Sequence, residues 1–291
     1  MNATATLPSM SPQLSTRCAL ALLGAMLFAS LMGLLAWGPI GYPVAVDRHA
    51  DPRAVLGLAQ GWNVLSLLPL LGVSAAGVVG LQRRRAGGPR RLAWRLFFGA
   101  AMLATAVGGF GHLARNESGL LLAQVVTASV CALLSLIYLA ERLGPRWVAP
   151  GLLAAAVASG PLGGLACAAS AAWLGGPDLR WLLWLEFLPV LLAPLGVWGL
   201  RSDGLRPRDW TVALLWFATA RVVDGADGWV WQASGGAIGG HAVHHLLLAG
   251  CVGWLAWRVL RQRDDAPSAS PDEIASALAA SQRAASLTTS G

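Results

Sequence analysis

The chain contains no lysine: all 21 of its basic residues are arginine. Because retinal proteins attach their chromophore to a lysine through a Schiff base, the sequence excludes that class of membrane protein. Charged residues are scarce, at 12% of the 291 residues, whereas hydrophobic residues make up 56%. Since proteins carry about 25% charged residues on average, the composition also excludes an ordinary soluble domain.

Cysteine is rare too, with four residues in four separate apolar segments: Cys18, Cys131, Cys167 and Cys251. This scatter gives neither a disulfide framework nor a metal-ligand spacing, so we expect each cysteine to be buried in apolar packing. Glycine, by contrast, is frequent around residue 160, at Gly160, Gly163 and Gly164. Small residues of this kind favour close contact between membrane helices.

Eight apolar segments are long enough to cross a bilayer, which takes about 20 residues each. They cover residues 18–38, 55–81, 92–113, 119–141, 148–173, 180–200, 210–232 and 239–260. We therefore predict an all-α fold, a polytopic membrane bundle with a seven-helix core over 55–261 and one extra amino-terminal helix. The apolar run of that first helix exceeds the roughly 7–15 residues of a signal-peptide core, which favours an uncleaved anchor after a segment 1–17. The polar tail 262–291 is expected to be disordered.

Arginine positions predict the orientation of the bundle. The loop between the second and third segments contains Arg83, Arg84 and Arg85, and short basic loops stay in the cytoplasm. Every second loop after it is also basic, through Arg142, Arg146, Arg201, Arg206, Arg208, Arg258, Arg261 and Arg263. Both termini are then expected in the cytoplasm of a multi-pass cell-membrane protein. The net charge of +7 reflects this topology and contact with anionic lipid headgroups, not binding of nucleic acid.

Histidine is concentrated where the last segment begins, in Gly240-His241-Ala242-Val243-His244-His245. His241 and His245 are four residues apart, so on a helix their imidazoles lie on one face. His112 ends the third segment, and the arginine pattern places it at the same, outer end of the bundle. Three acidic residues are expected there as well: Glu186, Asp224 and Asp227. Ionisable groups at membrane depth indicate a functional site.

Three histidines are a ligand set that leaves the fourth position of zinc to water, whose pKa then falls to about 7. We therefore expect His112, His241 and His245 to bind Zn²⁺, with His244 a neighbour because it points about 100° away on the helix. The alternative is that these histidines simply meet water at helix ends. Arg221 and Asp224 form a neutralising ion pair, or else Asp227 balances the charge of the metal or orients one of its histidines. The same choice stays open for Glu186.

These residues resemble the alkaline ceramidase superfamily, whose members are membrane zinc hydrolases similar to adiponectin-receptor-like proteins. The resemblance covers about 47–263 and is carried by Ala50-Asp51-Pro52-Arg53, His112, Asp178-Leu179-Arg180, Glu186-Phe187-Leu188-Pro189 and Gly240-His241 through His245. It implies that His112, His241 and His245 are the zinc ligands and that the substrate is the amide of a ceramide-like lipid. The bacterial branch of the family has one extra amino-terminal helix, as predicted here.

The chain departs from the family at two positions. Gly108 replaces a serine four residues before the first zinc histidine, and Ala123 replaces an aspartate eleven residues after it. An oxyanion donor contributes about 10²–10³ in rate and a positioned acid or base about 10²–10⁴. Gln60 stands where some members have a calcium-binding glutamate, so no calcium site is expected.

Three hypotheses follow. The first is a zinc hydrolase in which Asp227 or Glu186 moves the proton. In the second, the protein is catalytically silent and keeps zinc for a structural or sensing role. The third is a b-type haem held by His112 and a histidine of the last segment.

Overall fold

The computed structural model describes residues 16–41, 49–84, 88–114, 117–200 and 202–262. Almost all of the predicted segment 1–17 and of the tail 262–291 lies outside these residues. Within them the chain forms helices and no strand, apart from an isolated bridge between Val55 and Leu58. The prediction of an all-α bundle is therefore confirmed.

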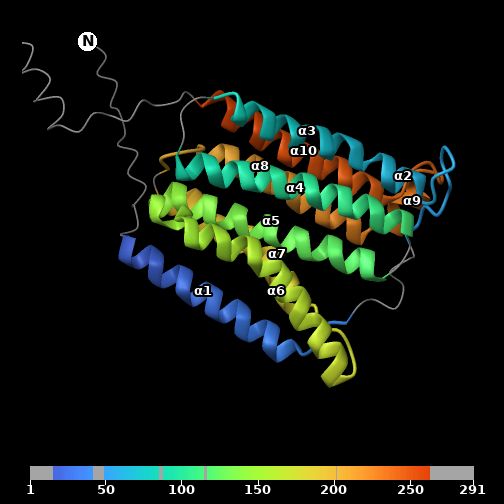
Figure 1. The fold of residues 1–291 in the computed structure, drawn as a ribbon, viewed down its shortest axis with the longest axis horizontal. Helices are drawn as coiled ribbons and strands as arrows, with labels where there is room; N and C mark the ends of the chain where they lie inside the picture. The colour runs from blue at the N-terminus through green and yellow to red at the C-terminus, as the bar shows by residue number, and fades with distance from the viewer. Residues whose placement is uncertain (1–15, 42–48, 85–87, 115–116, 201, 263–291) are drawn as a thin grey trace, which may run out of the picture. The chain divides into compact units, whose positions relative to one another are not determined.

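Eight long helices correspond to the eight predicted segments (Figure 1). They are α1 (Thr16–Trp37), α3 (Leu67–Gln82), α4 (Pro89–Ala114), α5 (Glu117–Leu143), α6 (Pro150–Leu174), α7 (Arg180–Gly199), α8 (Pro207–Gly225) and α10 (Gly240–Arg261). Three short elements are α2 (Gly61–Leu65), the 3₁₀ helix η1 (Pro145–Val148) and α9 (Asp227–Ala233). In the described part of the chain, six helical spans are long and apolar enough to cross a membrane, and the protein is a helical membrane protein.

Two compact units divide the chain, Met1–Leu260 and Arg261–Gly291, and all helices up to Leu260 belong to the first. In that unit α4 packs against α3 and α5, α5 packs against α6 and α7, and α1 packs against α7. We call the end of the bundle where α4 ends and α10 begins the histidine end. The opposite end, where α3 ends and α4 begins, is the arginine end.

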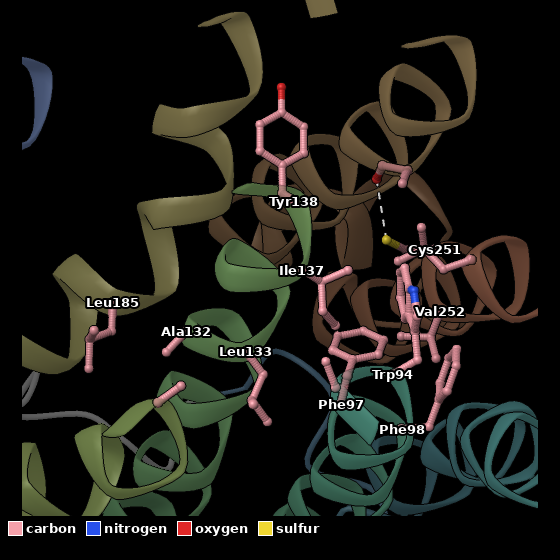
Figure 2. Packing of buried hydrophobic residues seen from close by; sticks show 14 of the residues in the cluster. Trp94, Phe97, Phe98, Ala132, Leu133, Ile137, Tyr138, Leu185, Cys251 and Val252 are labelled. Atoms are coloured by element: carbon pink, nitrogen blue, oxygen red, sulfur yellow. Dashed lines mark hydrogen bonds between the residues drawn. The ribbon is translucent and has the colours of Figure 1, made fainter. Parts of the chain in front are cut away.

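Aromatic side chains fill the core toward the arginine end (Figure 2). Trp94 and Phe97 of α4 meet edge to face with ring centres 5.6 Å apart, and Tyr138 of α5 meets Trp210 of α8 at 4.9 Å. Such pairs stabilise by about 0.5–1.5 kcal/mol beyond their buried area. The aromatic cluster closes this end of the bundle and leaves room between the helices nearer the histidine end.

Burial confirms the prediction for three of the four cysteines and contradicts it for the fourth. Cys131, Cys167 and Cys251 are buried, whereas Cys18 is exposed. Cys18 lies on α1, which packs mainly against α7. Much of the surface of α1 is exposed, and Cys18 belongs to this exposed part.

The second helix begins later than predicted. Residues 49–60, which we call the strap, are non-helical because Leu56, Gly57 and Gln60 have left-handed backbone angles, with φ of 54°, 77° and 48°. An α-helix cannot contain such residues, so α2 begins only at Gly61. The seventh predicted segment is also divided, since α8 ends at Gly225 and α9 begins at Asp227.

Candidate metal centre

All five histidines of the chain meet at the histidine end of the bundle. His49 comes from the strap, His112 from the last turn of α4, and His241, His244 and His245 from the first turns of α10. The rings of the three predicted ligands form a triangle, with centres 5.0 Å apart for His112–His241, 5.4 Å for His112–His245 and 4.5 Å for His241–His245. The sequence prediction that these three imidazoles lie together matches this geometry.

The spacing of the triangle fits one tetrahedral ion. With zinc–nitrogen bonds of about 2.0–2.1 Å, two ligating nitrogens lie about 3.3 Å apart and the centres of their rings about 5 Å apart. The Nε2 atoms of His112 and His241 are 3.3 Å apart. His112 and His241 therefore fit as two ligands of one metal ion, and the ring of His245 lies beside them.

The opposite nitrogen of each of these rings is anchored. The acceptors are Gln60 Oε1 for His112 Nδ1 at 3.0 Å, Asp224 Oδ1 for His241 Nδ1 at 2.7 Å and the Asn63 carbonyl for His245 Nδ1 at 3.1 Å. Each acceptor places the ring proton on Nδ1 and leaves the lone pair on Nε2. Lone pairs of His112 and His241 that face each other at 3.3 Å repel unless a cation lies between them. Metal-binding histidines are anchored through the other nitrogen in just this manner.

His49 is the histidine that sequence reasoning missed. One nitrogen each of His49, His112 and His241 lie within 4.8 Å of one another, which makes these three the possible metal-ligating group in the described part of the chain, and His245 is not a member of it. However, the ring of His49 stacks on that of His241, with centres 3.8 Å apart and planes at 25°. This separation is shorter than the roughly 5 Å between two rings on one ion. The sequence could have pointed to His49 because this residue directly precedes Ala50-Asp51-Pro52-Arg53, one of the segments that carry the family resemblance.

His244 points to a different partner. Its Nδ1 donates to the carbonyl of Ala220 in α8 at 2.9 Å, and its ring centre is 5.7 Å from that of His241. It is buried. The side chain therefore links α10 to α8 beside the triangle.

Asp224 of α8 and Asp227 of α9 have different hydrogen-bond partners. Asp224 lies 3.6 Å from the guanidinium of Arg221, and it is Asp224, rather than Asp227, that accepts from the ring of His241. Asp227 instead accepts backbone N–H groups, from His241 at 2.9 Å and from Ala50 at 2.6 Å. One carboxylate thus holds the ring of His241, and the other joins the first turn of α10 to the strap.

The strap is fixed over the histidine end by Arg53. Its guanidinium donates to both oxygens of Asp51, at 2.8 and 2.7 Å, and to the carbonyl of Ala237 at 2.8 Å. It also lies 4.6 Å from the ring centre of Trp231 in α9. The hydrogen bonds from Arg53 lower the pKa of Asp51, whose side chain is buried and stays a carboxylate.

A cavity of about 780 Å³ extends from the triangle into the bundle. His112 and Phe97 of α4 both line it, and the helix rises about 22 Å between these two residues. Polar lining comes from Gln124, Glu186, Arg221 and Asp224. Deeper lining is almost entirely apolar and includes Leu70, Ala101, Val130, Leu134, Phe217, Leu248, Val252 and Leu255. The cavity therefore combines a polar part at the histidines with a larger apolar part.

The predicted site residues are distributed around this cavity as follows. His112, His241, His245 and Glu186 line it, as do Gly108 and Ala123, the two positions that depart from the ceramidase pattern. Asp227 is not among the described residues that line the cavity. A side chain at Gly108 would meet only Leu67 Cδ1, at 3.9 Å, so a serine would fit there without strain.

Comparison of the chain with family models, with curated proteins and with solved structures gives no match. The resemblance to alkaline ceramidases therefore rests on the residues quoted above and stays a prediction.

Proposed function

We propose that this protein is an integral-membrane, zinc-dependent hydrolase that cleaves the amide bond of a ceramide-like lipid. One observation carries the proposal: three imidazoles, each anchored through Nδ1, lie together at one end of a largely apolar cavity, and the Nε2 atoms of His112 and His241 are 3.3 Å apart. A b-type haem is disfavoured because His112 and His241 Nε2 lie 3.3 Å apart, whereas the two axial ligands of one iron lie on opposite faces of the porphyrin.

His112, His241 and His245 would hold the ion. Bound zinc supplies a Lewis acid for the amide carbonyl and lowers the pKa of water to about 7. Hydrogen bonds to the ring nitrogens that face away from the ion keep the rings rigid. Asp224 holds His241 and adds a negative charge, while Gln60 holds His112. Removal of such anchors typically weakens metal binding by about 10–100-fold.

The apolar depth of the cavity supports a lipid substrate. An acyl chain would lie along the lining from α4, α5 and α10, and the amide would lie beside the histidines. Glu186 is the favoured proton carrier because its buried side chain lines the cavity. Asp227, the other candidate, already accepts two backbone N–H groups. In this proposal the histidine end faces the exoplasm, both termini face the cytoplasm, and water enters from outside.

Elemental analysis of the purified protein, followed by a fatty-acid release assay on a long-chain ceramide, tests the proposal. We expect one zinc per chain, and release that falls at least about 10²-fold in His241→Ala. The matched control is His244→Gln, which retains a donor for Ala220 and leaves the triangle intact. Absence of stoichiometric zinc, or equal release by wild type and His241→Ala, would contradict the proposal.

A second function is favoured by the residues beside the triangle. Gly108 and Ala123 line the cavity without a side-chain donor or acid, which suits a catalytically silent zinc protein with a structural or sensing role. Because a serine fits at position 108, the double variant Gly108→Ser, Ala123→Asp distinguishes the two functions. A gain in ceramide cleavage supports the hydrolase, and zinc without turnover in wild type and variant supports the silent protein.

A further inference from the structure

His49 is the one histidine of the cluster that no helix carries. It lies at the start of the strap, lines the cavity, and has a nitrogen within 4.8 Å of nitrogens of His112 and His241. Its side chain is largely covered, with 19% exposed. His49 is therefore within reach of an ion held by His112 and His241.

Hydrogen bonds fix the backbone that carries His49. Asp227 accepts the N–H of Ala50 through one oxygen and the N–H of His241 through the other, so one carboxylate joins the strap to α10. Further along, Arg53 ties the strap to the connection between α9 and α10 through Ala237. The residue next to His49 is thus held directly against the first turn of α10.

The separation of His49 from His241, unlike that from His112, differs from the separation of two rings on one ion. The ring centres of His49 and His112 are 5.3 Å apart, which is already close to the roughly 5 Å of co-ligands. His49 and His241 are stacked at 3.8 Å. A rotation of the His49 side chain, with the backbone unchanged, shifts its ring by the difference of about 1 Å.

We propose that His49 is a fourth donor to the metal held by His112, His241 and His245, and that it alternates with water at the fourth position. Zinc with four protein ligands is closed to substrate, whereas zinc with three keeps a position open. The strap would thereby close the centre when the cavity is empty and open it when the polar end of a lipid displaces His49. This inference rests on the metal site of the proposed function.

X-ray absorption at the zinc edge of the full-length, zinc-loaded protein in lipid-free detergent counts the imidazoles. We expect four in wild type, and three plus one oxygen in His49→Phe, which keeps a flat ring for stacking on His241 but has no nitrogen donor. Zinc affinity, measured by competition with a chelator, should fall at least about tenfold in this variant. The matched control is Leu56→Asn in the strap, where asparagine tolerates the left-handed backbone; its imidazole count should stay at four.

Three imidazoles in wild type, or unchanged zinc affinity in His49→Phe, would overturn the role of His49 and leave the proposed function intact. A wild-type protein without zinc would overturn the proposed function itself. Should His49→Phe not fold, His49→Gln is used in its place and is expected to give the same loss of one imidazole and of zinc affinity.

Discussion

At the scale of single residues, the nitrogen of each histidine that faces away from the cluster decides what the cluster can bind. Gln60, Asn63 and Asp224 accept from these nitrogens and leave the three Nε2 atoms with lone pairs. Gln60 stands where the ceramidase resemblance has a calcium ligand in some members, and its amide oxygen lies here against His112. The departure from the family pattern thus coincides with an anchor of the metal centre.

Variants of Asp224 and of its ion-pair partner Arg221 distinguish a role in anchoring His241 from a simple ion pair. We expect Asp224→Asn to weaken zinc binding by about 10–100-fold, because the carboxylate that fixes and polarises the His241 ring is lost. Arg221→Gln removes the same ion pair but leaves this anchor, so its zinc affinity should stay within a factor of about two of wild type. Competition with a chelator measures the zinc affinity of both variants. Equal losses of zinc affinity would show that the ion pair, and not the anchor, determines metal binding.

Residue spacing predicted part of this centre and not the rest. His112, His241 and His245 could be found from helical periodicity and from the arginine pattern, because both depend on local sequence. His49, Gln60 and Asn63 lie in or beside the strap, where left-handed residues replace a helix. The side chains of His49 and Gln60 and the carbonyl of Asn63 reach the centre only through the folding of this irregular segment, which no periodic pattern predicts.

At the scale of helices, small residues allow α5 and α6 to approach closely. A Cβ atom at Gly160 would overlap the carbonyl of Val125 and the hydroxyl of Ser129 in α5. We expect Gly160→Val to lower the thermal unfolding temperature in detergent, since overpacking typically costs about 1–3 kcal/mol. Gly151→Val is the control on the same helix, because nothing lies within 4 Å of a Cβ there. An equal shift in both variants would mean that general helix or lipid effects dominate.

The carboxylate of Asp178 holds the connection between α6 and α7 in place through hydrogen bonds. Asp178 accepts from the guanidinium of Arg180 and from the backbone N–H of Ile40, after α1, at 3.3 Å. Burial raises the pKa of Asp178, but the hydrogen bonds from Arg180 and Ile40 bring the pKa below its ordinary value. A group with a lowered pKa in the folded state stabilises above its unfolded pKa of about 3.9, and this contribution is lost as the pH falls through the folded value.

Asp178→Asn should therefore unfold at a lower temperature than wild type at pH 7, and the difference should shrink as the pH approaches 3. Thermal melts of both proteins between pH 3 and 7 measure this. A difference that is constant over this range would contradict the assignment of the effect to the charge of Asp178.

At this scale, hydropathy predicted the existence of the helices but not all of their boundaries. Hydropathy located eight segments, and eight long helices correspond to them. Apolar residues continue through 55–60 and 226–232, however, so hydropathy alone could not detect the left-handed residues before Gly61 or the break at Ala226. Both irregular stretches lie at the histidine end, where the side chain of Gln60 holds His112 and that of Asp227 joins α10 to the strap.

At the scale of the whole molecule, the direction in which the histidine end faces decides where water and substrate enter. Arginine counting predicts the exoplasmic side, because the basic loops lie at the other end. Single cysteines at two exposed positions test this in intact cells, Gln232→Cys in α9 and Arg146→Cys in η1, both in a Cys18→Ala background. A membrane-impermeant maleimide should label Gln232→Cys alone, and both once the cells are lysed. Labelling of Arg146→Cys instead would invert the bundle, and the proposed hydrolase would then act on lipid from the cytoplasmic leaflet.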